Sequence, residues 1–191
     1  GAQPVLDFTD AGMATTYLAS HVQVESALVM LMAHLAQAGV DAIVVEIADG
    51  VLQRETAALL RSQGFARLVS GIVMASQDSM GASAGVSWLQ AHASTPVLAL
   101  SGVISAAPLQ AREASTALGL QVLDRQGLAT PETALDILGR AQQHMEAVLT
   151  QKTSPDGASR HGSKKSRRRG WANGPEVVAA AGTAAAPGAA V

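Results

Sequence analysis

The stretch AIVVEIADG, residues 42–50, decides the fold class expected for this chain. It begins with a β-branched apolar run, continues into two acids and ends at a glycine, and residues 52–60 then have the pattern of a helix. A continuous apolar run is typical of a buried parallel strand. Acids at the end of such a strand lie at the carboxyl edge of the sheet, where open α/β folds bind their ligands. Glu46 and Asp49 are therefore the candidate catalytic residues.

Both acids also have a purely structural interpretation. Asp is a common N-cap, so Asp49 can serve only to begin the helix that follows it. Glu46 can equally be a solvated surface charge. The pattern of residues alone leaves these alternatives open.

Strand-like and helix-like segments alternate through residues 1–150. Further apolar runs occupy residues 4–8, 68–75, 96–100 and 120–123, and apolar stripes at helical spacing occupy residues 28–35, 52–60, 82–89 and 135–149. This alternation predicts a doubly wound, mostly parallel α/β sheet with flanking helices. Right-handed crossovers would bring the ends of all the strands to the same edge.

That edge is expected to collect acids and hydroxyls from several loops. They are Asp7, Asp10, Glu46, Asp49, Ser76, Asp78 and Ser101. Hard oxygen ligands in a row suit a magnesium–phosphate site, because Mg²⁺ takes a few carboxylates together with water and phosphate oxygens. Glu46 and Asp10 are the predicted metal ligands, and Asp10, Ser76, Asp78 and Ser101 are predicted to line the cofactor or substrate pocket. Polar loops of this kind also occur in α/β proteins that bind no metal.

Composition narrows the chemistry. The chain has 191 residues and is 48% hydrophobic but only 3% aromatic, so its core must be built from aliphatic side chains. The absence of cysteine excludes disulfides, thiol catalysis and cysteine-ligated metals, and it fits a cytoplasmic protein. No apolar run approaches the roughly 20 residues needed to cross a bilayer, so no membrane partner is expected. The start at Gly1 leads us to expect a fragment or a processed product.

The charge is distributed unevenly along the chain. Residues 1–150 contain six arginines, no lysine and thirteen acids, for a net charge of −7, whereas residues 151–191 contain seven basic residues and two acids, for a net charge of +5. Residues 1–150 are therefore the predicted α/β domain, and residues 151–191 are predicted to be a disordered tail, basic at first and then rich in Ala and Gly. Nucleic acid or anionic lipid would contact only the basic cluster at residues 164–169, and a solvated tail is the favoured interpretation.

Other residues that attract attention are better explained without chemistry. The five histidines are scattered without metal-ligand spacing, and no serine lies in a G-x-S-x-G motif. The adjacent pairs Arg54-Glu55 and Arg112-Glu113 are expected to be ordinary helix-surface charges.

Residues 44–50 resemble the second acidic motif of dethiobiotin-synthetase-like P-loop proteins, in which a strand ends in Glu-Gly-Ala-Gly-Gly. Glu46 takes the position of the glutamate that helps to hold Mg²⁺-ATP, Ala48 and Gly50 agree with the motif, and Ile47 and Asp49 stand in place of glycines. The resemblance extends over residues 1–125, through the segments 9–12, 46–56, 101–102, 108–109 and 112–113. It implies a P-loop NTPase-like fold with Mg²⁺ and ATP as cofactors.

The Walker A loop of such proteins, G-x-x-x-x-G-K-[ST], does not occur in residues 1–191. The resemblance therefore implies either the distal part of an Mg-ATP-dependent ATPase or ligase-like protein, or a relative that has lost nucleotide binding, and the fragment is favoured. This chain alone is not expected to bind a nucleotide tightly. The alternatives are a non-catalytic interaction module and a small-molecule-binding, flavodoxin-like domain. The substrate is not specified by the sequence, and a homodimer is compatible with it.

Overall fold

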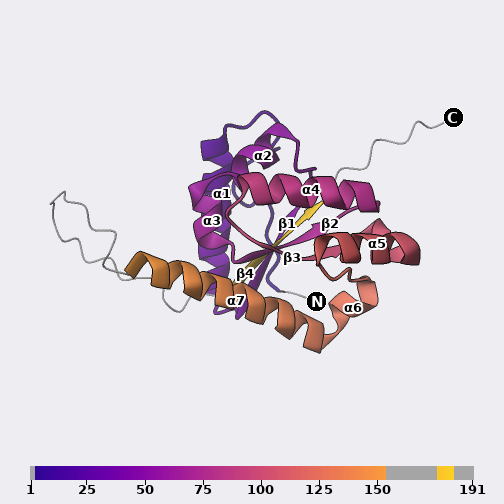
Figure 1. Cartoon of the computed structure of the whole chain (residues 1–191). Coiled ribbons are helices and arrows are strands. Elements are labelled where there is room, and N and C mark those ends of the chain that lie inside the picture. Colours follow the sequence, from indigo (N-terminus) through magenta and orange to yellow (C-terminus); the bar gives the residue numbers. More distant parts are fainter. Residues whose placement is uncertain (1–2, 154–175, 183–191) are drawn as a thin grey trace.

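The computed structural model describes residues 3–153 and 176–182, and it has the predicted α/β architecture (Figure 1). Four strands form one sheet in which every pair of neighbours is parallel. In chain order the strands are β1 (Ala42–Ile47), β2 (Gly71–Ala75), β3 (Val97–Ser101) and β4 (Glu176–Gly182). Their order across the sheet is β1-β4-β2-β3, so β4 lies between β1 and β2.

Helices connect the strands. They are α1 (His21–Gln37), α2 (Arg54–Leu60), α3 (Gln63–Leu68), α4 (Ser79–His92), the 3₁₀ helix η1 (Val103–Ala106), α5 (Pro108–Leu118), α6 (Arg125–Ala129) and α7 (Pro131–Thr153). Two helix starts have a local cause. Ser20 and Gln23 form a reciprocal capping box at the start of α1, and Pro108 occupies the first turn of α5.

The core lies on both faces of the sheet, because side chains alternate along each strand. Ile72 and Met74 of β2 point into the larger cluster, which includes Leu60 and Phe65 from α2 and α3, and all four side chains have no exposed surface. The opposite face is covered by α7, whose buried Ile137 and Ala141 pack with Val178, Leu98, Ala99 and Leu123. Burying one large aliphatic side chain stabilises a fold by about 1.5 to 3 kcal/mol.

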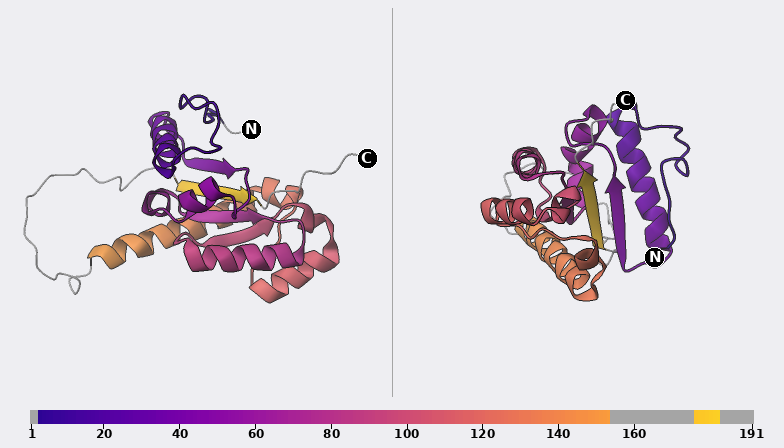
Figure 2. Two further views of the ribbon diagram at one scale, coloured as in Figure 1. Left: turned by 90° about the horizontal axis from the view of Figure 1, so that it is seen from above. Right: turned by 90° about the vertical axis from the view of Figure 1, so that its right-hand side faces the viewer.

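The crossovers account for the strand order. The connection from β1 to β2 passes beyond β4 by way of α2 and α3 on the face of the larger cluster, and the return from β3 to β4 runs in the opposite direction with α7 on the other face (Figure 2). Because all neighbouring strands are parallel, the carboxyl ends of the four strands lie at one edge.

Strand β4 corrects a prediction. Residues 151–191 were expected to be disordered, but residues 151–153 complete α7 and Glu176–Gly182 form a central strand. Val178 and Ala179 are buried there, with exposed fractions of 6% and 0%. Small side chains suit a strand that has neighbours on both sides, and its backbone hydrogen bonds come from β1 and β2. The described residues do not include residues 154–175, which contain the basic cluster, or residues 183–191.

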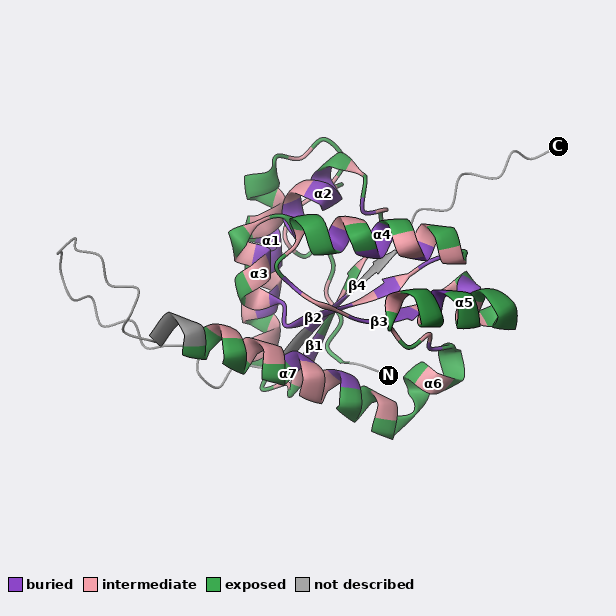
Figure 3. Ribbon diagram, viewed as in Figure 1, coloured by how far each residue is buried: buried purple, intermediate pink, exposed green. Residues whose placement is uncertain are grey.

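Strand β1 also differs from expectation. It was predicted to be buried, but it is the edge strand, and Val44 is 70% exposed although its register partner Val178 is buried. The difference arises because α7 packs on β2, β3 and β4, whereas Val44 stays uncovered. Figure 3 shows the buried, intermediate and exposed residues along α7 and the other helices.

Two short predicted strands are not regular strands either. The segment expected as a strand at residues 4–8 has no regular structure and leads into turns at residues 8–12, and Val122 makes only an isolated bridge to Leu100. Among the described residues, no helix combines the length and apolar character needed to cross a membrane.

Candidate functional site

The candidate site is the carboxyl edge of the sheet, where three described loops follow the strands. Residues 48–53 follow β1, residues 76–78 follow β2, and Gly102 leads from β3 into η1. Because β4 lies between β1 and β2, its last residue, Gly182, lies between the first two of these loops. The strands therefore end at one edge, as the sequence predicted. One of the two central strands, β4, was not predicted.

Glu46 is the next-to-last residue of β1 and is exposed. Its register partner is Ala180 of β4, two residues before the end of that strand. Glu46 shares a face of the strand with Val44, because the two are separated by one residue. The carboxylate therefore extends from the uncovered face of the edge strand, close to the end of β4, where water and small ions can reach it.

Asp49 is exposed in the loop after β1, and it does not cap the next helix. Gln53 does so instead, because its side-chain oxygen accepts a hydrogen bond from the Thr56 N–H at 2.8 Å. The loop is anchored by Val51, which is only 4% exposed, and by a 2.9 Å hydrogen bond from the Gln53 N–H to the Gly50 carbonyl. The interpretation of Asp49 as the N-cap is therefore wrong, and its carboxylate remains in solvent.

Ser76 and Asp78 have structural partners within their own loop. Ser76 is 3% exposed and its hydroxyl donates to the Asp78 carbonyl at 2.9 Å. The Asp78 carboxylate accepts the Gly81 N–H at 2.6 Å and so caps α4. Both residues hold the β2 loop in shape, and their side chains are engaged by the protein itself.

The loops after β2 and β3 are in direct backbone contact. The Ser76 N–H donates to the Ser101 carbonyl at 2.9 Å, and the Ile104 N–H donates to the Ser76 carbonyl at 3.1 Å. Gly102, at φ +95°, passes so close that an added Cβ would lie 2.8 Å from the backbone nitrogen and oxygen of Ser76. The hydroxyl of Ser101 points back into the domain and donates to the Leu123 carbonyl at 2.8 Å.

Asp10 belongs to a compact turn near the amino terminus. Its carboxylate accepts the Asp7 N–H at 2.8 Å, and Asp7 in turn accepts the N–H and hydroxyl of Thr9 at 2.7 and 2.6 Å. The Thr9 hydroxyl, followed by the Thr9 N–H, lowers the pKa of Asp7. Asp10 and Glu46 were predicted to bind a metal together, but within residues 3–153 the Asp10 carboxylate is hydrogen-bonded to Asp7 and makes no direct contact with Glu46.

Residues 3–153 and 176–182 contain no cluster of three or more His, Asp or Glu side chains that is arranged to hold a metal ion. A single exposed carboxylate still fits magnesium, since Mg²⁺ is commonly held by one or two carboxylates together with waters and substrate phosphates. On the β1 side of the edge, Glu46 and Asp49 have the exposure that such a role requires.

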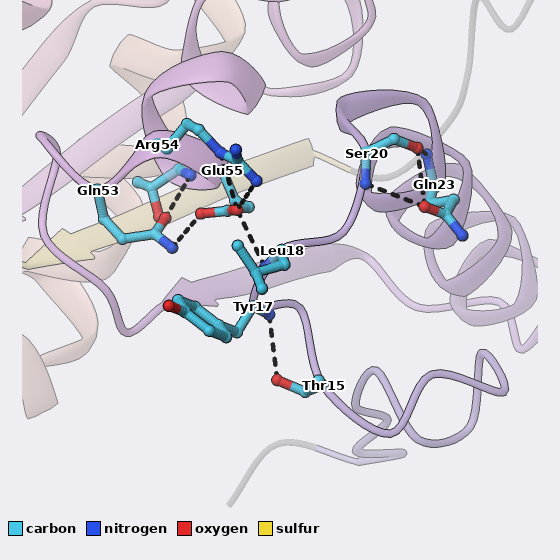
Figure 4. A network of polar contacts seen from close by, with 9 residues as sticks. Thr15, Tyr17, Leu18, Ser20, Gln23, Gln53, Arg54 and Glu55 are labelled. Atoms are coloured by element: carbon cyan, nitrogen blue, oxygen red, sulfur yellow. Dashed lines mark hydrogen bonds and ion pairs between the residues drawn. The ribbon is translucent and has the colours of Figure 1, made fainter.

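Glu55 is the polar residue at this edge whose environment the sequence did not predict. It was expected to be a surface charge, but only 6% of it is exposed. Hydrogen bonds from Arg54 and from the Leu18 N–H surround its carboxylate, and Arg54 is the main cause of its lowered pKa (Figure 4). Leu18 lies 37 residues earlier in the chain, so no local pattern could have indicated the contact.

Glu113, also expected to be a surface charge, accepts the Ser79 hydroxyl at 2.6 Å and links α5 to α4.

Comparison of the whole chain with protein-family models, with curated proteins and with solved structures gave no match.

Proposed function

We propose that this chain forms the metal- and substrate-facing side of an Mg-ATP-dependent P-loop ATPase or ligase-like protein, with Glu46 as the carboxylate that orients the metal. The proposal begins from the resemblance of residues 44–50 to an acidic motif that binds Mg²⁺-ATP. The observation that supports it most directly is the register of β1 with β4. Glu46 lies beside Ala180, near the end of a central parallel strand, and ligands of open α/β sheets bind outside such ends.

Each site residue would have a separate task. Magnesium, when bound, would neutralise phosphate charge during transfer. Glu46 would hold it, and Asp49 would orient the attacking group. Asp10 would contribute to holding the metal only after it gives up its hydrogen bond with the Asp7 N–H. The substrate side of the edge would be shaped by Ser76, Asp78 and Ser101. Their side chains already form hydrogen bonds with backbone groups of the neighbouring loops.

A titration of the chain with Mg²⁺ and with Mg-ATP tests this proposal. We expect a millimolar dissociation constant, because residues 1–191 lack the lysine and backbone cradle of a Walker A loop. Amide NMR shifts should gather in residues 45–50, and Glu46→Gln should remove most of them. Asp41→Asn is the matched control, since Asp41 is an exposed acid at the opposite end of the same strand.

Two results would contradict the proposal. One is a complete absence of shifts at residues 45–50 at millimolar Mg-ATP. The other is an equal loss in Asp41→Asn and Glu46→Gln, which would indicate unspecific attraction to acidic side chains. A micromolar affinity would contradict the expectation that nucleotide binding needs a Walker A loop, and it would require a different phosphate cradle in this chain.

A non-catalytic interaction module is the second candidate, and one observation favours it. Four exposed apolar side chains belong to the segments that follow β1, β2 and β3, namely Leu52, Met80, Val103 and Leu109. A hydrophobic fluorescent probe should then bind the chain, and Met80→Ser and Leu109→Ser should each reduce its signal. The control Val29→Ser changes an exposed residue of α1 and should leave the signal unchanged. An equal effect of all three substitutions would contradict a localised interaction surface.

A further inference from the structure

The amino-terminal segment, residues 3–19, forms no helix or strand and is called here the strap. Its described hydrogen bonds are mostly internal, such as those of the turn at residues 7–13. The described core clusters include no side chain from the strap. Little therefore holds this segment in place before α1 begins.

One hydrogen bond connects the strap to the described elements that follow α1. The Leu18 N–H donates to Oε1 of Glu55 at 3.0 Å. The same oxygen accepts Nε and Nη2 of Arg54 at 3.1 and 2.7 Å, and the other oxygen accepts the Gln53 side-chain amide (Figure 4). Glu55 is 6% exposed, so both oxygens depend on these donors in place of water.

The backbone of Leu18 indicates that this bond determines the local conformation. Among the described residues, Leu18 is the one residue other than glycine that has a positive φ. Its φ is +62°, in a region that leucine seldom adopts. Such a conformation persists only when its surroundings hold it in place. The Leu18 side chain is 65% exposed, so packing cannot be the main cause.

The bond also brings the strap to the candidate site. Glu55 is in the first turn of α2, directly after the loop that leaves the carboxyl end of β1. Tyr17 is 68% exposed and precedes Leu18, so it lies at the rim of the same edge (Figure 4). We propose that the strap opens and closes as a unit over the β1 side of the carboxyl edge, and that Glu55 is the latch that holds it closed. The nature of the ligand that it admits rests on the proposed function.

Substitutions at Leu18 test the latch without altering the helical domain. Leu18→Pro removes the N–H and fixes φ near −65°, whereas Leu18→Gly keeps the N–H and adopts positive φ easily. Losing one hydrogen bond to a charged acceptor should raise the open fraction of the strap about tenfold or more. We therefore expect faster chymotrypsin cleavage after Phe8 and faster amide exchange over residues 13–17 in Leu18→Pro. Leu18→Gly should match the wild type.

Equal cleavage and exchange rates in Leu18→Pro and the wild type would overturn the latch, and so would the same acceleration in Leu18→Gly. Glu55→Ala should release the strap in the same way while the exchange of β2 amides stays slow. Should Glu55→Ala unfold the whole chain, the comparison at Leu18 still decides the question, because residue 18 contributes nothing to the core clusters.

Ligand binding tests the second half of the proposal. If only the open form admits Mg-ATP, the apparent affinity rises with the open fraction. A tenfold gain in opening should then tighten Mg-ATP binding by up to about tenfold in Leu18→Pro. An unchanged affinity in a chain whose strap is released would overturn the gating role. A chain that binds no Mg-ATP in either state would contradict the proposed function and leave the latch result intact.

Discussion

At the scale of single residues, exposure separates two kinds of acid at the carboxyl edge. Glu46 and Asp49 are exposed, whereas Glu55 is enclosed by donors from its own helix and from the strap. An exposed carboxylate remains hydrated and contributes little to stability. An enclosed one contributes to stability only while it is ionised, since its partners are all donors.

Glu46→Gln should therefore leave the free energy of unfolding within about 0.5 kcal/mol of the wild type, as is usual for surface substitutions. Urea unfolding monitored by circular dichroism measures this difference. A loss of more than about 2 kcal/mol would mean that Glu46 belongs to a buried network, which would remove it from the candidate site.

Glu55 should make stability depend on pH. Arg54 and the other donors hold its pKa below the ordinary value of 4.5, so the folded state binds the proton less readily than the unfolded state. Its stabilising contribution is complete above pH 4.5 and is lost as the pH falls through the lower folded pKa. Glu55→Gln should flatten the dependence of unfolding free energy on pH in this acid range.

Asp7→Asn is the control for this prediction, because the pKa of Asp7 is also lowered and Asp7 titrates in the same direction. Its effect on the curve should be independent of that of Glu55→Gln, since the two carboxylates have different partners. A Glu55→Gln protein with the pH profile of the wild type would contradict the lowered pKa.

At the scale of elements, the site depends on how closely two loops approach. The loops after β2 and β3 share backbone hydrogen bonds, and Gly102 fits between them because it has no Cβ. The hydroxyls of Ser76 and Ser101 donate elsewhere, to the carbonyls of Asp78 and Leu123. The sequence predicted these two serines as pocket lining, and the structure gives their backbone groups a role in holding the two loops together.

Gly102→Ala should destabilise the fold by about 1 to 3 kcal/mol, since it combines a positive φ with a close approach to the Ser76 backbone. Gly119→Ala is the matched control: Gly119 has φ +66° but no atom within 4 Å of an added Cβ. The control should lose about 1 kcal/mol, the usual cost of a left-handed residue other than glycine. Equal losses by thermal unfolding would contradict the close contact at Gly102.

At the scale of the whole molecule, the sequence predicted the fold class because its apolar runs are separated by helical stripes. Residues 42–47, 71–75 and 97–101 are parallel strands as expected. The position of β1 was not predictable, since an exposed Val44 and a buried one have the same sequence. Its exposure depends on where α7 lies, more than eighty residues later.

Strand β4 was missed for a related reason. Residues 176–182 read EVVAAAG and follow a polar, basic segment, which together are typical of a disordered tail. Their strand conformation comes from pairing with β1 on one side and β2 on the other, a tertiary effect that overrides weak local propensity. The centre of the candidate site was missed for the same reason, because it is the end of β4.

Hydrogen exchange of the amides in residues 176–182 tests the architecture most directly. The central position of β4 predicts that these amides exchange as slowly as those of β2, residues 71–75, because both strands are hydrogen-bonded to neighbours on two sides. Exchange at the rate of an unstructured peptide, in a chain whose β2 amides remain protected, would contradict the four-stranded sheet and the candidate site built around its centre.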